Sequence, residues 1–479
     1  MNYISSLRAQ KVLGVTGVRL GSISLLVLVS FGIGGARANP RIYSYLESVS
    51  PASSVSTQSN GILQGIVEDP NGASISSVKI SSVELNTGRS RTVQSDAAGF
   101  YQFVSMPVGT YRITGKISGF KTQIVNDVNV EVGRTTTLNL QFVVGEVAEE
   151  IRIESNTALV NLESVSVGQV INERTVQEIP LNGRYFIDLG LLIPGSVTPP
   201  QNGYLSPPTR GGGSLALNTG GNREDTVNFQ INGITLNDQL NNILNFNPPL
   251  TSIREFKIDN STFSAEYGRN SGAVINVATR SGTRDFHGEL YEFFRNDALD
   301  ARNFFNFSSA EPPPFKRNQF GGALSGPLIL PRFGEGGPPL WSGRKSTFFY
   351  FNYESLQQRQ RVDINTLVLS DAQRASVTDP VIRRLVDLIP RPNFFDAAGS
   401  PRFIGSAPAS ADVKQWSLDI THNFSTNDML HGYYVYQDAL RNEPTLQGTT
   451  IPGFGDVRIG TRQIFTSNET HIFAPQLVN

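Results

Sequence analysis

The chain has 479 residues, which is long enough for three or four domains. Its 40 Lys and Arg residues almost balance its 41 Asp and Glu residues, so no overall charge indicates a nucleic-acid partner. It contains no cysteine, and this excludes disulfides, thiolate metal sites and a cysteine nucleophile.

Residues 1–38 have the form of a secretory signal peptide. Basic residues precede a short apolar run from Ile23 to Ile33, and Ala36 and Ala38 then give the small-residue pattern of a cleavage site. The run is too short to span the roughly 30 Å hydrocarbon core as a helix. We predict a cleaved signal, with an uncleaved anchor as the alternative. Residues 39–60 are rich in Ser and are predicted to be a linker.

Residues 61–145 alternate between short β-forming runs and turn residues. Asp69–Gly72 and Asp96–Gly99 are strong turn sequences, and six or seven strands fit between and around them. This spacing predicts a small antiparallel β-sandwich. The turns and the Val108-Gly109-Thr110-Tyr111 run resemble a carboxypeptidase regulatory-like domain, which implies a transthyretin-like fold. We expect a structural spacer there, with glycan binding as the alternative.

Residues 146–162 are polar and β-tending, and are predicted to be an interdomain linker. An extended segment of this kind can add itself as a strand to a partner, because strand addition needs only an accessible backbone edge. The residues that would make such a contact are Glu146, Val147, Glu149, Ile151 and Ile153.

Residues 163–283 carry the most specific pattern in the chain. An Asn-Gly pair between apolar β-forming residues predicts a tight hairpin turn at Asn232 and Gly233. A Gly-rich stretch, Arg210–Gly213, lacks the Gly-Lys-Ser/Thr that a phosphate-binding loop needs. We call the residues that mark this pattern the motif residues. In chain order they are Asn182, Gly183, Arg184, Asn232, Gly233, Tyr267, Gly268 and Asn276.

The order of these elements resembles the plug domain of TonB-dependent receptors, in the Oar-like branch. The resemblance covers more than 100 residues. It implies an α+β plug that closes an outer-membrane β-barrel, and a TonB energy-transducing complex in the inner membrane as partner. It also implies that TonB pairs with residues 146–162, although a plain connector is the alternative reading of that segment.

Residues 284–479 contain amphipathic strands. In Trp416–Phe424 the apolar residues Trp416, Leu418 and Ile420 alternate with the polar residues Ser417, Asp419 and Thr421. About nine residues with terminal aromatics match a tilted membrane strand. Only about six strands are expected here, whereas plugged transporters need about 22. We therefore expect an incomplete transmembrane antiparallel β-barrel, with the receptor cut off partway.

The expected fold class is mainly β: a sandwich, then an α+β plug, then the first barrel strands. The expected function is ligand binding and energised transport across the outer membrane of a Gram-negative bacterium. The alternative is surface adhesion or glycan binding through the sandwich. The expected partners are TonB, outer-membrane lipid and an unknown ligand (an oligosaccharide, chelate or peptide), without nucleic acid; import and export both stay open.

We expect no enzyme, no cofactor and no metal. The four histidines fall in predicted strands, and none stands in a His-x-x-Glu or His-x-x-x-His arrangement. A Gly-x-Ser-x-Gly nucleophile elbow is also missing from the sequence.

Overall fold

The computed structural model describes most of the chain from residue 60 onward. The gaps are 146–149, 155–166, 182, 198–216, 238–241, 243, 245, 262, 264–266, 269, 302–313, 333–338, 446–451, 475–476 and 479. The predicted signal peptide with Ala36 and Ala38 lies outside the described residues, as do Glu146, Val147, Glu149 and Asn182. The described residues belong to one unit of the chain, 54–479.

The N-terminal part is a sandwich of two sheets. One sheet has the order β4-β1-β7, with β8 also paired to β1, and the other has the order β3-β2-β5-β6-β9. The strands are β1 (Gly61–Glu68), β2 (Lys79–Glu84), β3 (Ser90–Gln94), β4 (Phe100–Met106), β5 (Gly109–Lys116), β6 (Thr122–Val130), β7 (Thr135–Thr137), β8 (Leu140–Gln141) and β9 (Glu150–Glu154). Alternate residues of β1 are buried, as a half-buried strand requires.

The prediction of a purely antiparallel sandwich is wrong in one respect. Strands β7 and β8 run parallel to β1, and β9 runs parallel to β6. After β6 the chain crosses to the other sheet, where β7 and β8 run alongside β1 in the same direction. At this contact only glycine fits at position 65, because a Cβ there would lie 1.9 Å from the Leu138 carbonyl oxygen.

The middle part of the chain is built on a mixed sheet with the order β10-β15-β16-β13-β14. Its elements are β10 (Val167–Ile171), α1 (Glu173–Glu178), η1 (Phe186–Leu192), β11 (Ser196–Val197), β12 (Asn218–Thr219), η2 (Glu224–Thr226), β13 (Asn228–Ile231), β14 (Ile234–Thr235), η3 (Leu250–Ser252), β15 (Ile253–Ser261) and β16 (Val274–Thr279). We call residues 167–279 the central domain. Asn172 caps α1 by accepting a hydrogen bond from the Thr175 amide.

The predicted hairpin at Asn232 and Gly233 is confirmed. Strands β13 and β14 pair directly across it, and both turn residues have positive φ, 49° and 81°. That pair of angles belongs to the type I′ turn, which matches the twist of the flanking strands.

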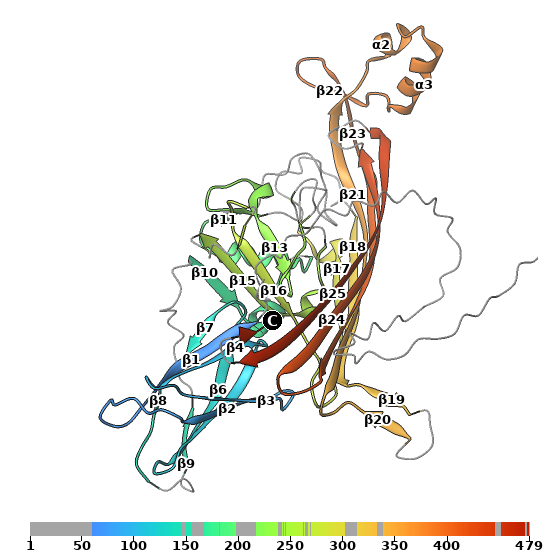
Figure 1. Ribbon diagram of the computed structural model, residues 1–479. Helices are drawn as coiled ribbons and strands as arrows, with labels where there is room; N and C mark the ends of the chain where they lie inside the picture. The colour runs from blue at the N-terminus through green and yellow to red at the C-terminus, as the bar shows by residue number, and fades with distance from the viewer. Residues whose placement is uncertain are drawn as a thin grey trace, which may run out of the picture. The chain divides into compact units, whose positions relative to one another are not determined.

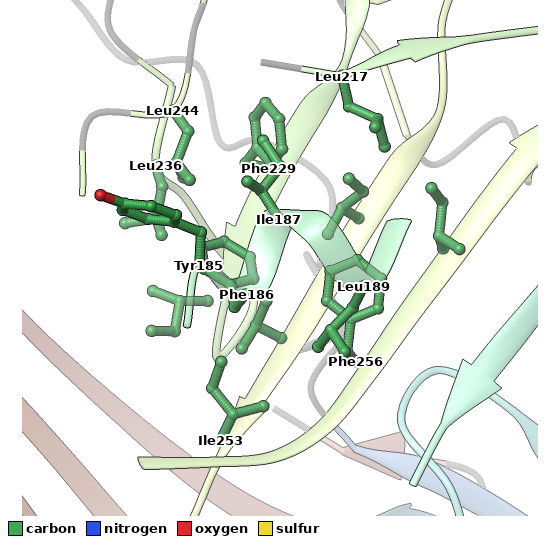
Figure 2. Close-up of a cluster of buried hydrophobic side chains, with 14 of the residues drawn as sticks. Tyr185, Phe186, Ile187, Leu189, Leu217, Phe229, Leu236, Leu244, Ile253 and Phe256 are labelled. Carbon is green, nitrogen blue, oxygen red and sulfur yellow. The ribbon is translucent and has the colours of Figure 1, made fainter. Parts of the chain in front are cut away.

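The core of the central domain fills the space between η1 and the sheet. Figure 2 shows Phe186, Phe229 and Phe256 converging there with aliphatic side chains from both elements. The same apolar cluster continues into Tyr433 and Val435 of a later strand. Burial of this continuous cluster holds the central domain and that strand together.

The C-terminal part is one antiparallel sheet of long strands, which Figure 1 shows side by side. We call it the wall. Its order is β17-β18-β21-β23-β24-β25-β26, with β22 on the end of β23. The strands are β17 (His287–Asn296), β18 (Phe315–Pro327), β21 (Thr347–Leu367), β22 (Phe394–Phe395), β23 (Pro401–Asn423), β24 (Asp428–Thr445), β25 (Pro452–Ala474) and β26 (Leu477–Val478).

The two faces of the wall differ as predicted. In β23 the side chains of Ser417 and Asp419 are buried on the face toward the central domain, while Trp416 lies on the opposite face. The prediction of strands of about nine residues is wrong, because β23 has 23 residues and β24 has 18. Their hydrogen-bonded pairing continues past the alternating apolar pattern that the sequence displays.

The connections of the wall carry small elements. The β21–β23 connection holds α2 (Asp371–Ala375) and α3 (Pro380–Leu388), while β19 (Ile329–Pro331) pairs with β20 (Leu340–Ser342) and η4 spans Asp297–Leu299. No helix in the described ranges is long and apolar enough to cross a membrane. The mainly β fold that the sequence predicts is confirmed.

Candidate functional site at the seam between the central domain and the wall

The Asn232 turn is joined to the wall by a chain of hydrogen bonds. Asn232 Nδ2 donates to Thr279 Oγ1 at 2.9 Å, and the Thr279 hydroxyl lies 3.2 Å from Asp419 Oδ2. The same carboxylate oxygen lies 2.6 Å from His431 Nε2. We call these four residues the polar chain. Because Asn232, Thr279 and Asp419 are buried, their hydrogen bonds face little competition from water.

A second contact forms at η3 of the central domain. The Tyr350 hydroxyl donates to the Thr251 carbonyl oxygen at 2.5 Å, and Asn352 Nδ2 donates to Thr251 Oγ1 at 2.7 Å. Both donors lie on the inward face of β21. The sequence pattern did not single out Thr251, Tyr350 or Asn352. The one available signal was the aromatic-rich run from 349 to 353, in which Asn352 is the one residue that is not aromatic.

Arg184 makes the third contact between the central domain and the wall. It adopts a left-handed backbone conformation with φ of 54°, and its guanidinium carbon lies 4.0 Å from the centre of the Phe293 ring. This is a short cation–π contact. Burial lowers the pKa of Arg184 from its ordinary value, and the nearby Glu354 carboxylate opposes that shift. The predicted motif residue Arg184 therefore meets the first strand of the wall.

Inside the wall, polar side chains form a line across five strands. Tyr291 of β17 donates to Glu354 of β21, Gln415 of β23 donates to the same carboxylate, Gln437 of β24 donates to Gln415, and Arg462 of β25 donates to Gln437, at 2.8–3.2 Å. The central domain thus rests on a hydrogen-bonded polar surface.

The other predicted motif residues are spread through the central domain. Asn276 Nδ2 donates to the Tyr267 hydroxyl at 3.2 Å, and both side chains are buried. Gly183 has φ of 90° beside Tyr185, so glycine is needed there. Gly268 is exposed, and a Cβ on it would meet no neighbour. The structure brings Asn232 and Arg184 to the seam and places Asn276 and Tyr267 inside the domain.

Glu255 of β15 lies on a face of the central domain that meets the sandwich. The Val132 amide donates to Glu255 Oε2 at 2.9 Å, and Lys257 Nζ donates to the Gly133 carbonyl oxygen at 2.8 Å. Burial raises the pKa of Glu255 to about 7, against the opposing effects of the Val132 hydrogen bond and Arg254.

The packing of the sandwich over Glu255 is therefore expected to lose stability as the pH rises, because the buried carboxyl group becomes charged, even though the Val132 hydrogen bond itself favours the charged form. Because the folded pKa of Glu255 is above its ordinary value, its stabilising contribution is fully present below about pH 4.5 and is lost as the pH rises through about 7. Hydrogen exchange of the Val132 amide, corrected for intrinsic rates, should show less protection at pH 8 than at pH 5.5. Glu255→Gln should remove this difference, whereas Glu178→Gln, in an exposed ion pair with Arg174, should keep it. An unchanged pH profile in Glu255→Gln would contradict the assignment.

One group of side chains in the described residues could hold a cation. Asp428, Glu469 and His471 place possible ligand atoms within 4.8 Å of one another, at the end of the β24–β25 pair where β24 begins. No His pair in the sequence marks this group, because two of its ligands lie two residues apart on one strand face and the third lies on the neighbouring strand. Glu469 is exposed, and His471 already bonds to Asp428.

Two families of known protein domains match parts of the chain. Residues 62–143 match the carboxypeptidase regulatory-like domain family, and residues 278–479 match the outer membrane beta barrel domain family. The TonB-dependent transporter Oar of Myxococcus xanthus is 21% identical to the chain over 340 residues, which are 68% of this chain and 30% of that protein. The chain is a homologue of a TonB-dependent transporter. It spans less than a third of this relative's length.

Solved outer-membrane proteins also align with the chain. The outer membrane transporter YddB of Escherichia coli gives a TM-score of 0.42 at 11% identity, covering 64% of this chain and 37% of that one. The ferric enterobactin receptor PfeA of Pseudomonas aeruginosa gives 0.39 at 11% identity, covering 64% and 38%. The predicted Oar-like resemblance and the carboxypeptidase regulatory-like domain are confirmed, and the family match indicates the outer membrane.

Proposed function

We propose that the chain is the plug-bearing part of an outer-membrane receptor that binds a ligand and moves it with energy from TonB. In this proposal the plug is 163–283, the first barrel strands are 284–479, and 1–38 is a signal peptide removed on export. The observation that carries the proposal is the polar chain, which ties the Asn232 turn to the inward face of β23 and β24.

The composition of the seam suits a plug that must move. An apolar seam alone would have to expose hydrocarbon to water when the plug shifts, at about 25 cal/mol per Å². Beside the apolar contacts at Tyr433 and Val435, the polar chain and the Thr251 contacts would expose groups that water can solvate. The net free energy of a hydrogen bond is about 1 kcal/mol, so a modest pulling energy could exchange such contacts for contacts with water.

TonB would engage the segment before the plug. Ile151 and Ile153 lie in β9, an edge strand of the sandwich sheet that pairs on one side with β6. An edge strand offers backbone groups to a further strand. The proposed contact residues are Glu146, Val147, Glu149, Ile151 and Ile153, of which the structure describes the backbone of the last two.

This contact predicts a loss of TonB binding when β9 cannot pair. The purified chain in detergent micelles should retain the soluble C-terminal domain of TonB from the same bacterium. Ile151→Pro with Ile153→Pro should weaken that binding at least tenfold, because proline lacks the amide donor and breaks strand pairing. Ile151→Val with Ile153→Val is the matched control and should bind normally. TonB binding that survives the double proline change would refute the proposed contact.

A further inference from the structure

The connection between β18 and β21 is long for its place in the wall. It spans residues 328–346 and holds the hairpin of β19 and β20, which Figure 1 shows projecting from the end of the wall. The connection between β23 and β24, at the same end, spans only residues 424–427. One end of an outer-membrane barrel normally has short turns, so this hairpin is an addition to the barrel pattern.

The hairpin exposes apolar side chains on both of its faces. The exposed fractions are 41% for Ile329, 46% for Leu330, 54% for Leu340 and 38% for Trp341. Leu330 stands opposite Trp341, while Leu340 stands opposite Pro331 and therefore lies on the other face. Each strand has three residues, and an isolated two-stranded hairpin is at best marginally stable in water. A less polar surrounding would therefore stabilise it.

The end of the wall that carries the hairpin also carries exposed aromatic residues. These are Phe286, Phe424 and Phe473, which are 55%, 64% and 64% exposed. Phe424 follows Trp416 at even spacing and therefore lies on the same outward face. Aromatic residues gathered at one level of a barrel mark the boundary between membrane and water. The hairpin therefore leaves the wall at a membrane boundary.

The hairpin begins at the depth of the lipid headgroups. Gly326 of β18 stands opposite Phe349, whose ring packs against that of Phe286 with centroids 6.4 Å apart. The short step from Gly326 to Ile329 is about 10 Å of strand, or about 8 Å along the membrane normal at a tilt of about 40°. The headgroup region is about 5–8 Å thick on each side of the hydrocarbon core. Trp341 thus reaches the layer that tryptophan favours.

Basic residues flank the hairpin. Arg332 follows β19, Arg344 and Lys345 follow β20, and all three are exposed. Arg344 pairs with Asp285 at 2.7 Å. Long basic side chains at a membrane boundary can reach phosphate oxygens while their stems stay in the apolar layer. These charges therefore suit anionic phospholipid.

We propose that β19 and β20 insert into the headgroup layer of the outer membrane, where Trp341 contacts acyl chains and Arg332 and Lys345 bind the phosphate of anionic phospholipid. This inference goes beyond the proposed receptor function, and only the choice of leaflet rests on that function. At this end of the wall the Arg284 amide donates to the Asn86 carbonyl oxygen of the sandwich at 3.0 Å. The sandwich carries the proposed TonB contact, so the leaflet is the periplasmic one.

The chain has two tryptophans, so the depth of Trp341 can be measured directly. Trp416→Phe leaves Trp341 as the single tryptophan, and the full chain is reconstituted in vesicles of phosphatidylethanolamine and phosphatidylglycerol. Phospholipids brominated near the headgroup should quench Trp341 fluorescence, while water-soluble acrylamide should quench it weakly. Trp341→Phe is the reciprocal control, because Trp416 on the outward face of β23 should also be quenched by brominated lipid.

Leu330→Asp in the Trp416→Phe chain tests the hairpin itself. It places a carboxylate opposite Trp341 and should lower quenching by brominated lipid roughly twofold or more, because charged groups resist transfer out of water. Leu385→Asp is the matched control, since Leu385 of α3 is also 46% exposed but lies in the connection at the other end of the wall. In the Trp341→Phe chain, Leu330→Asp should leave quenching of Trp416 unchanged, because the wall stays in the bilayer.

Strong acrylamide quenching of Trp341 without quenching by brominated lipid would overturn the proposal, because the hairpin would then face water. Weak quenching by both reagents would also overturn it, since Trp341 would then be covered by protein. If brominated lipid quenched neither tryptophan, the proposal would fail together with the membrane placement of the wall. The measurement contains no TonB, so loss of TonB binding with Trp341 quenching intact would count against the receptor function alone.

Discussion

Replacing Phe256 by alanine is expected to lower the free energy of unfolding of the central domain by about 3–5 kcal/mol. Phe256 is fully buried, and its ring meets that of Phe186 edge to face with centroids 6.0 Å apart. Figure 2 shows both rings enclosed between η1 and the sheet. The strands on either side are fixed by their own pairing, so the cavity cannot collapse.

Chemical denaturation of the chain in detergent micelles, followed by near-ultraviolet circular dichroism, measures this loss. Total stabilities of domains are about 5–15 kcal/mol, so the variant should unfold at a clearly lower denaturant concentration. Leu191→Ala is the matched control, because Leu191 lies in η1, the segment that carries Phe186, but is 41% exposed. It should cost less than about 1 kcal/mol. Equal losses in the two variants would contradict the placement of this core.

Local patterns in the sequence predicted the local structure well. The Asn-Gly pair at 232 and 233 specified its hairpin, because few residues tolerate positive φ at both turn positions. The alternation around Trp416 specified which face of β23 turns inward, because side chains on a strand alternate with period two. Both signals lie within a few residues of the structure they determine.

The seam could not be predicted, because its contacts join residues far apart in sequence. Thr279 meets Asp419 across 140 positions, and Asn468 donates to the Asn232 carbonyl oxygen across 236. The periodicity of β23 assigns Asp419 to the inward face but cannot specify which residue it faces. That depends on the register of four wall strands and on how the central domain packs against them.

Arg184 combines a local feature that the sequence predicted with a long-range contact that it could not predict. Its place in the sequence motif marked it as a plug residue, and its positive φ follows from the adjoining Gly183 turn. Its contact with Phe293 arises only after β17 pairs with β18 and the wall meets the central domain. The lengths of β21 and β23 were missed because polar residues continue the pairing beyond the amphipathic stretch.

Replacing Asp419 by alanine is expected to loosen the seam by about 3–5 kcal/mol, because it leaves buried polar partners unpaired. The carboxylate is 1% exposed and joins His431 to Thr279. Without it, His431 Nε2 and the Thr279 hydroxyl both lose a partner on the wall side of the polar chain. Amides of β16 should then exchange hydrogen faster in the chain held in detergent micelles.

Asp412→Ala is the control, since Asp412 lies on the same strand but pairs with Arg359 on the outward face. An exposed pair of this kind contributes about 0–1 kcal/mol. Asp419 and His431 are expected to stabilise the seam as a pair. His431→Ala should therefore lower the stability by less in the Asp419→Ala variant than in the otherwise unaltered chain. Additive losses would mean that the two side chains act independently. The polar chain would then not be the element that holds the central domain against the wall, and the apolar contacts at Tyr433 and Val435 would hold it instead.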